Sequence, residues 1–147
     1  MTKIPKKILV VDDSPVTQGL CRRMFENAGY AVIEALSGKE CMEKVKIQKP
    51  YVILMDVILT DSNGKELVRE LRKKPHLTGV PIIFMTNTLS LKADKGYETF
   101  AIDGELFRAF AKPVHIPKIL SAIRKECNRT LHGGQPSPKL QDPQDDF

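Results

Sequence analysis

Short apolar runs alternate with amphipathic stretches along most of this chain. Five runs have the length of buried strands and cover residues 8–11, 31–35, 51–55, 81–85 and 107–111. Stretches between and after them repeat apolar residues at helical spacing, which predicts helices at residues 15–28, 38–45, 64–71 and 116–127. A weaker helix is predicted within residues 89–102.

Strands that alternate with helices predict an α/β fold with a parallel sheet and right-handed crossovers. Near-continuous apolar strands are typical of a sheet that is covered on both faces. The run at residues 31–35 alternates and contains Glu34, which suits an edge position. We therefore predict a doubly wound, five-stranded parallel sheet of flavodoxin-like type in the order 2-1-3-4-5, with a ligand crevice between strands 1 and 3.

Polar residues with useful chemistry end four of the five runs. Asp12 and Asp13 follow the first run, Asp56 the third, Thr86 the fourth and Lys112 the fifth. Because parallel strands end at one edge of a sheet, these side chains are expected to converge. Carboxylate oxygens in a partly hydrated site suit Mg²⁺. Asp56 is the candidate nucleophile for forming an acyl phosphate, with Lys112 neutralising charge and Thr86 hydrogen-bonding to the phosphate.

Each of these residues also has an ordinary structural explanation. Asp12 and Asp13 can cap the first helix, because acidic residues are common at helix N-termini. Asp56 can be a turn residue, Thr86 a strand-end cap, and Lys112 part of a turn with the following proline. A shared site explains their position at the ends of four strands better than four separate coincidences.

Composition narrows the class of protein further. The 147 residues are 41% hydrophobic and 28% charged, which is typical of a globular chain. We predict one domain at residues 1–132 and a disordered polar tail at 133–147, which lacks apolar periodicity. No apolar stretch approaches the roughly 20 residues of a membrane helix, and no signal peptide is evident, so a cytoplasmic location is expected.

Charge and cysteine content add no further site. The net charge is +5, but no zinc-finger, helix-turn-helix or other DNA-binding pattern is visible. The three cysteines are far apart and form no Cys-x-x-Cys pair, which favours reduced thiols over a metal site.

The order and spacing of these motifs resemble the receiver domain of two-component response regulators, of the stand-alone, chemotaxis-regulator-like type. The similarity extends from residue 7 to about residue 128. Its motifs are the first strand with its acid pair (residues 8–14), the strand ending in Asp56, Gly64 eight residues later, the strand ending in Thr86, and Lys112-Pro113.

The resemblance implies specific roles. Asp56 would accept a phosphoryl group from a histidine kinase or phosphotransfer protein, while Lys112 and Thr86 would contact that group. Asp13, Asp56 and the backbone carbonyl of Ile58 would bind Mg²⁺, and Asp12 would act through a metal-bound water. The Lys112-Pro113 peptide bond is usually cis in the family. Such a domain catalyses only its own phosphorylation and dephosphorylation.

Four departures from the family pattern concern the output switch. Ala109 stands where an aromatic residue is usual, Asn87 where a small residue is usual, and Thr60 where proline is common. The stretch between Thr86 and Lys112 is also a few residues longer than usual.

Two alternatives therefore remain beside the phosphorylated receiver. One is a receiver-like interaction module that works without phosphorylation. The other, ranked last, is a flavodoxin-like cofactor binder or small enzyme, because no glycine-rich phosphate loop is present. For the receiver we expect an unidentified downstream protein partner, no DNA-binding domain, no membrane association, and a monomer or weak dimer.

Overall fold

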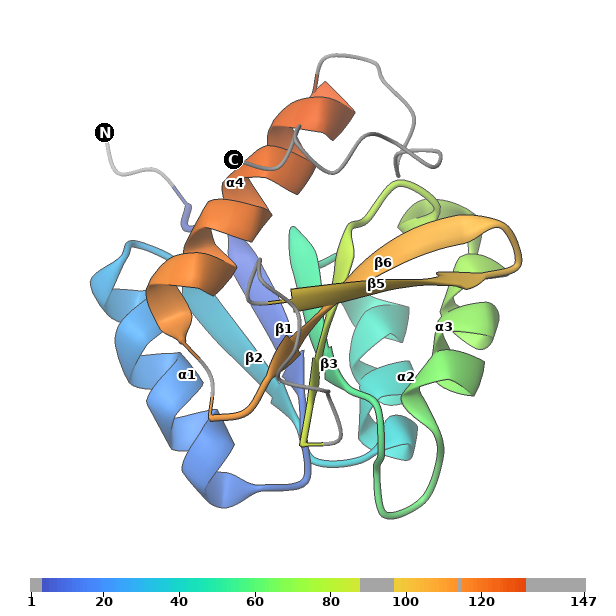
Figure 1. Ribbon diagram of the computed structural model, residues 1–147, viewed down its shortest axis with the longest axis horizontal. Coiled ribbons are helices and arrows are strands. Elements are labelled where there is room, and N and C mark those ends of the chain that lie inside the picture. Colours follow the sequence, from blue (N-terminus) through green and yellow to red (C-terminus); the bar gives the residue numbers. More distant parts are fainter. Residues whose placement is uncertain (1–3, 88–96, 114, 132–147) are drawn as a thin grey trace.

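A computed structural model describes residues 4–87, 97–113 and 115–131 of the chain. In this part, a twisted sheet lies between two layers of helices (Figure 1). The elements in chain order are β1 (Lys7–Val11), α1 (Pro15–Asn27), β2 (Ala31–Ala35), α2 (Gly38–Ile47), β3 (Val52–Asp56), α3 (Gly64–Arg72), the short 3-10 helix η1 (Pro75–Leu77), β4 (Ile82–Thr86), β5 (Tyr97–Ile102), β6 (Glu105–Ala111) and α4 (Ile116–Leu131).

The sheet has the order β2-β1-β3-β4-β6-β5. Every neighbouring pair from β2 to β6 is parallel, so the predicted order is confirmed with β6 as the fifth parallel strand. The chain reverses its winding between β1 and β3, where Leu9 pairs with Ile53. The carboxyl ends of these two strands therefore flank the position at which doubly wound sheets bind ligands.

The sheet contains one strand, β5, that the sequence analysis did not predict. Residues 97–102 form β5, which pairs antiparallel with β6, so the helix predicted within residues 89–102 is wrong for this part; residues 89–96 lie outside the described residues. The turn between the two strands is Asp103-Gly104, and both residues have positive φ, 51° and 86°. This is the pattern of a type I′ hairpin turn, for which Asp-Gly is a preferred sequence. The sheet is thus six-stranded and mixed.

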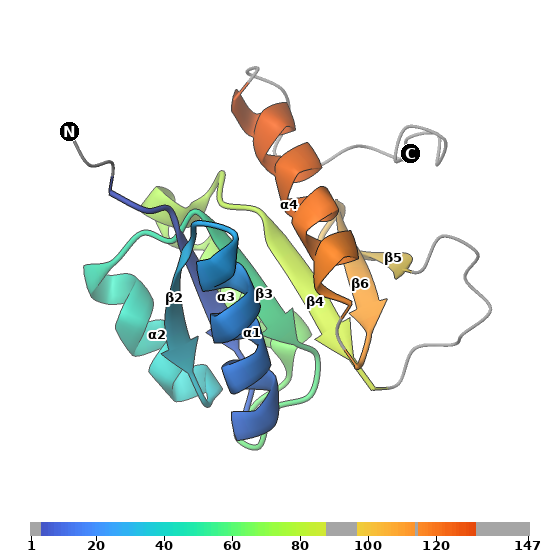
Figure 2. The same cartoon turned by 90° about the vertical axis from the view of Figure 1, so that its left-hand side faces the viewer.

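Two apolar layers hold the helices to the sheet, because successive strand residues face opposite sides. Leu9, Ile53 and Phe84 belong to the core cluster shared with α2 and α3. Ile8 and Leu54 belong to the other cluster, shared with α1 and α4. Figure 2 shows α1 and α4 on one side of the sheet with α2 on the other.

Side-chain caps begin the helices that leave the carboxyl edge of the sheet. Ser14 Oγ accepts the Thr17 N–H at 3.2 Å at the start of α1. Ser37 Oγ accepts the Glu40 N–H at 3.1 Å at the start of α2. Such caps satisfy donors that lack a partner within the helix, and they fix where each loop ends.

The predicted boundary between a domain at residues 1–132 and a disordered tail at 133–147 stays a prediction, because residues 132–147 lie outside the described part. Among the described residues, no helix combines the length and apolar character needed to cross a membrane.

Candidate metal and phosphoryl site

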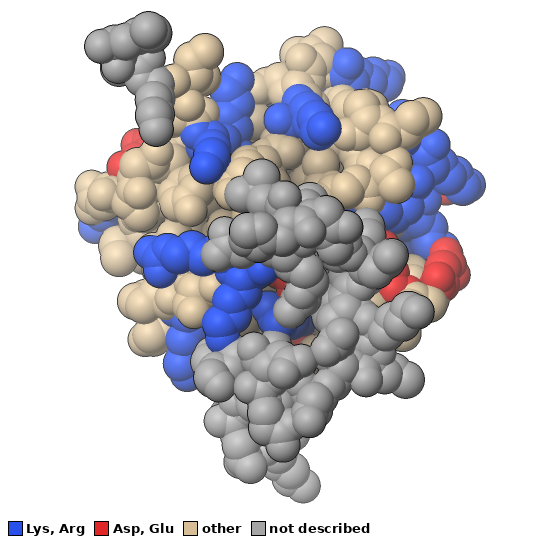
Figure 3. Space-filling model, turned by 90° about the horizontal axis from the view of Figure 1, so that it is seen from above, with Lys and Arg blue, Asp and Glu red and all other residues tan. Residues whose placement is uncertain are grey.

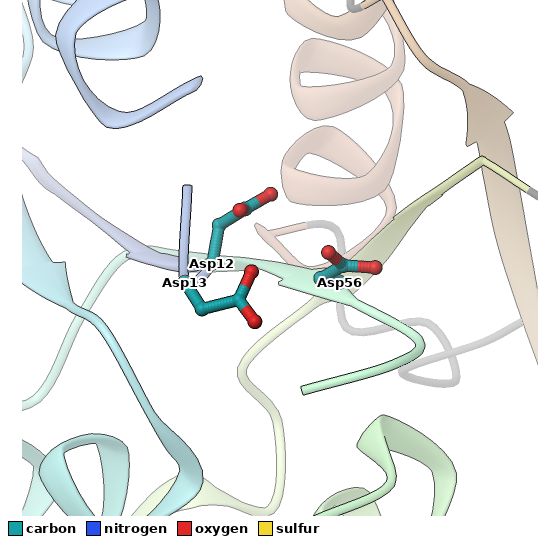
Figure 4. A group of neighbouring side chains, drawn as sticks. All are labelled: Asp12, Asp13 and Asp56. Carbon is teal, nitrogen blue, oxygen red and sulfur yellow. The ribbon is translucent and has the colours of Figure 1, made fainter. Parts of the chain in front are cut away.

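Three carboxylates meet at the carboxyl edge of the sheet. Asp12 and Asp13 follow β1, and Asp56 is the last residue of β3 (Figure 4). Each offers an oxygen, and these oxygens all lie within 4.8 Å of one another. The predicted convergence of the acid pair with Asp56 is therefore observed, because adjacent parallel strands in register end together.

Lys112 connects two of these carboxylates from the end of β6. Its Nζ lies 2.6 Å from Asp12 Oδ2 and donates a hydrogen bond of 2.8 Å to Asp56 Oδ2. Burial alone would lower the pKa of the Lys112 ammonium, but its hydrogen bonds to Asp12 and Asp56 and their charges raise it above the ordinary value. Lys112 therefore stays positively charged at neutral pH.

Asp12 is the buried member of the acid pair. Its side chain is fully buried, and Oδ1 accepts the Ser14 N–H at 2.7 Å. Both oxygens are thus turned to groups within the fold, and Asp13 rather than Asp12 lines the open cavity.

Asp56 lines the same cavity as Asp13, although only 6% of its surface is exposed. Burial raises the pKa of the Asp56 carboxyl, while the hydrogen bond and charge of Lys112 and the Ile58 N–H act in the opposite direction. The Ile58 N–H donates to Oδ1 at 3.2 Å. Asp56 is therefore oriented by two donors, one in the loop after β3 and one directly after β6.

Gly64 explains how α3 approaches Asp56. A Cβ at Gly64 would clash with the carbonyl oxygen of Asp56 and would lie 3.1 Å from Val57 Cα. The Gly64 N–H also donates to Val57 O at 2.6 Å. Only glycine fits this contact without a backbone shift, so this position helps to define the backbone around Asp56.

Gln18 is a positioning residue that the sequence reasoning missed. Its Nε2 lies within 3.1 Å of three carbonyl oxygens, those of Val10, Asp12 and Ala35. Three acceptors require the amide nitrogen at this place, and Gln18 is 2% exposed. One side chain of α1 thereby ties the ends of β1 and β2 together behind the acid pair. A glutamine within a predicted amphipathic helix gave no sign of this role, although Gln18 is buried on the same face of α1 as Cys21 and Phe25.

A cavity of about 600 Å³ opens beside the acids. Residues from the ends of four strands and from the start of α1 line it: Asp13, Ser14, Thr17, Asp56, Ile58, Thr86, Asn87, Lys112 and Pro113. All predicted site residues except the buried Asp12 therefore face one space. Thr86 is 4% exposed, and the Lys112-Pro113 peptide bond is cis, as the resemblance implied.

The charges of this cluster suit a divalent cation. Three carboxylates and the one ammonium of Lys112 leave a formal charge of −2 when all are ionised. Hard oxygen donors are the ligands that Mg²⁺ and Ca²⁺ prefer, and here they lie beside an open cavity. Figure 3 looks onto the opposite edge of the sheet, where Lys and Arg outnumber Asp and Glu among the visible charged side chains.

The family follows from a match over most of the chain. The response regulator receiver domain model matches residues 8–124. The chain belongs to the response regulator receiver family. It is a signalling domain rather than a conventional enzyme, and its pocket of Asp12, Asp13 and Asp56 is consistent with Mg²⁺-dependent phosphorylation of an aspartate. Family membership implies a histidine kinase as partner.

Relatives of this receiver include stand-alone regulators. It is 28% identical over 121 residues to the polar-differentiation response regulator DivK of Brucella anthropi, covering 82% of this chain and 95% of DivK. The chemotaxis response regulator CheY4 of Vibrio cholerae has a TM-score of 0.69 at 25% identity, covering 83% of this chain and 98% of CheY4.

A third related protein has been solved with a metal ion in its site. The receiver domain of the sensor histidine kinase PA1611 of Pseudomonas aeruginosa was solved with a magnesium ion coordinated in its active-site cleft. It matches with a TM-score of 0.69 at 25% identity, covering 85% of this chain and 99% of that domain.

Proposed function

We propose that this receiver accepts a phosphoryl group on Asp56 from the phosphohistidine of a histidine kinase or phosphotransfer protein. The observation that supports this most directly is the Asp56 carboxylate, held by Lys112 at the rim of an open cavity beside two further acids. A carboxylate oxygen of Asp56 would attack phosphorus, and the phosphorus–nitrogen bond would break. The electron pair would leave with the histidine nitrogen, and the product would be an acyl phosphate.

In this proposal Asp13 and Asp56 hold Mg²⁺ together with the backbone carbonyl of Ile58, and Asp12 acts through a metal-bound water. The formal charge of −2 and the position of Asp13 and Ile58 on the cavity wall support this arrangement. When bound, Mg²⁺ supplies positive charge that offsets the negative charge of the incoming phosphoryl group.

Lys112 and Thr86 would hold the transferred group. The Lys112 ammonium already contacts the Asp56 carboxylate, so it can donate to a phosphoryl oxygen after transfer with little movement. Thr86 lies on the neighbouring strand β4 and lines the same cavity, where its hydroxyl can donate to a second oxygen. Both interactions stabilise charge that appears during transfer.

The output in this proposal is a changed protein-binding surface that acts on an unidentified downstream protein. Thr86 is the last residue of β4, Lys112 directly follows β6, and β5 lies beside β6, so a shift at either residue can be transmitted to this side of the sheet. The expected cytoplasmic location stays a prediction.

The test is intact-mass measurement after incubation with Mg²⁺ and a small acyl-phosphate donor. Wild type should gain one phosphoryl group, and Asp56→Asn should gain none. Asp103→Asn is the matched control, because it makes the same chemical change on the hairpin turn, outside the cavity. Stoichiometric uptake by Asp56→Asn would disprove the assignment of the nucleophile.

A second candidate function is an interaction module that works without phosphorylation. Ala109, at the position where the family usually has an aromatic switch residue, is 1% exposed and pairs with Phe84. The segment before it is a hairpin instead of the predicted helix. The test is phosphoryl uptake from its kinase and from the small donor, measured in parallel with a receiver that accepts both. No uptake by wild type under these conditions would favour this function.

A further inference from the structure

The outer side of β5 is an edge of the sheet. β5 occupies the last place in the strand order, and within the described residues only β6 pairs with it. Edge strands present a row of backbone donors and acceptors that another strand can use, and proteins commonly block them with proline, lysine or a bulge. The sequence of β5, Tyr-Glu-Thr-Phe-Ala-Ile, contains neither proline nor lysine.

The hairpin turn identifies which backbone groups point outward. Ile102 pairs with Glu105 across the two-residue turn, and the closing pair of such a turn exchanges hydrogen bonds. Hydrogen-bonded and non-hydrogen-bonded pairs then alternate along the hairpin. Phe100 therefore bonds to β6, whereas the N–H and C=O groups of Thr99 and Ala101 point away from it. The side chains of Thr99 and Ala101 are exposed and small.

The side chains on the α3 face of β5 are suited to self-association. The Phe100 ring packs at 5.0 Å from the Phe84 ring, measured between centroids, and is only partly buried. Glu98 lies two residues away on the same face, and no ion pair is found for it among the described residues. Lys65 of α3 places its Nζ 4.4 Å from the centroid of the Phe100 ring. An acidic and a basic group thus flank one partly buried aromatic ring.

We propose that β5 pairs antiparallel with β5 of a second copy of this chain. Thr99 and Ala101 of one copy would exchange hydrogen bonds with Ala101 and Thr99 of the other. The two Phe100 rings would then face each other in the central non-hydrogen-bonded pair, where side chains approach most closely.

Charge complementarity favours a second copy of this chain as the partner of the β5 edge. A two-fold axis perpendicular to the sheet keeps the α3 faces of both copies on the same side. Glu98 of one copy then lies diagonally opposite Phe100 of the other, within reach of the lysine above that ring. The same contact occurs twice by symmetry, as in an isologous interface. This inference is independent of phosphorylation on Asp56.

Sedimentation of the full chain from micromolar to millimolar concentration tests the pairing. Wild type should show a reversible monomer–dimer equilibrium. Thr99→Pro removes the outward N–H without touching the bonds to β6, so the dimer dissociation constant should increase about tenfold or more. Thr99→Val retains the N–H and a similar shape, and is the matched control that should dimerise like wild type.

A charge exchange tests the same geometry without changing the backbone. Glu98→Lys and Lys65→Glu should each dimerise several-fold more weakly than wild type. An equimolar mixture of the two variants restores both opposite-charge contacts in a heterodimer, so it should associate more tightly than either variant alone. A wild type that is monomeric throughout, or a dimer that responds neither to Thr99→Pro nor to the mixture, would overturn the proposal.

Discussion

Gly64 begins α3 directly against the backbone of Asp56. The space for a Cβ is closed by the Asp56 carbonyl oxygen, by Val57 Cα at 3.1 Å and by Phe84 Cε1 at 3.2 Å. Backbone atoms form most of this barrier, and they cannot rotate away as the end of a flexible side chain can. The position of the candidate nucleophile is thus coupled to the start of a helix eight residues later.

Gly64→Ala should therefore destabilise the fold and disturb the site together. We expect a loss of about 1–3 kcal/mol in the free energy of unfolding, as for other overpacked positions, with slower phosphoryl uptake. Gly79→Ala is the matched control, because an added Cβ there meets nothing within 4 Å. Denaturant unfolding and intact mass measure the two effects, and equal stability of both variants would contradict the steric argument.

Asp61 connects the loop after β3 to the start of α2. Its carboxylate accepts the Gly38 N–H at 2.9 Å and the Lys39 N–H at 3.1 Å. These two backbone hydrogen bonds lower the pKa of Asp61. A lowered pKa in the folded state means that ionised Asp61 stabilises the fold above its unfolded pKa, and that this contribution is lost as pH falls through the folded value.

Asp61→Ala should thus have a lower Tm than wild type at neutral pH, and the difference should shrink in acid. Glu43→Ala, which removes an exposed carboxylate from the same helix, is the control and should follow wild type. Thermal unfolding from pH 7 to pH 3 measures the difference. A difference that grows in acid would contradict the assigned hydrogen bonds.

The pKa of Asp56 is shifted in the opposite direction from that of Asp61. Burial raises its pKa above the ordinary value, so the folded state binds more protons than the unfolded state between the two pKa values. Stability then falls as pH rises through this window. Asp56→Asn should accordingly have a higher Tm than wild type at pH 7 without metal, and this advantage should diminish at lower pH. Thermal unfolding with a chelator measures it, with Asp103→Asn as control.

The converging strand-end residues could be predicted from the sequence because parallel strands align their carboxyl ends. Asp12, Asp56, Thr86 and Lys112 needed only the correct strand order to meet. The distances between them depend on packing, however. Asp12 is fully buried, and Lys112 contacts both Asp12 and Asp56. Both facts depend on how the strands and loops pack in three dimensions, which no local sequence pattern encodes.

The hairpin was missed although its signal is present in the sequence. Asp103-Gly104 separates two strands, of which the first alternates in burial, and Asp-Gly is a preferred dipeptide for a two-residue hairpin turn. The alternation of strands and helices earlier in the chain led instead to the prediction of a helix within residues 89–102. Gln18 is a different case, since its three carbonyl partners come from β1, the following loop and β2 and meet only in the folded chain.

The hairpin is anchored to α3 by Arg72. Its Nε and Nη2 donate to the two carboxylate oxygens of Glu105 at 2.9 and 2.7 Å, and Nη1 donates to Leu77 O at 2.7 Å. Lysine cannot reproduce this planar geometry, so Arg72→Lys should lower the free energy of unfolding by about 1–2 kcal/mol.

Arg69→Lys is the matched control for Arg72→Lys. Its partner Asp103 is exposed and 3.4 Å away, so we expect a change within about 0.5 kcal/mol. Denaturant unfolding of both variants decides whether the bidentate contact stabilises the hairpin. Equal losses in the two variants would show that it does not.

Lys112 links stability, metal binding and phosphorylation in one side chain. Its side chain is 10% exposed and lies against two carboxylates, of which Asp12 is fully buried. Lys112→Met keeps most of the aliphatic stem but leaves these acids without their cation. Removing one partner of a buried ion pair costs about 3–5 kcal/mol, so the metal-free variant should be markedly less stable than wild type.

Mg²⁺ should restore part of this stability, because the cluster has lost one positive charge and attracts a cation more strongly. We therefore expect Lys112→Met to bind Mg²⁺ at least as tightly as wild type and to show a larger increase in Tm on its addition. Phosphoryl uptake should nevertheless fall by roughly 10²–10³-fold, since the donor to the phosphoryl oxygen is missing. Calorimetric titration, thermal unfolding and intact mass measure the three effects, with the exposed Lys118→Met as control. A variant that loses Mg²⁺ binding altogether while remaining folded would show that Lys112 supports the metal site instead of the transferred group.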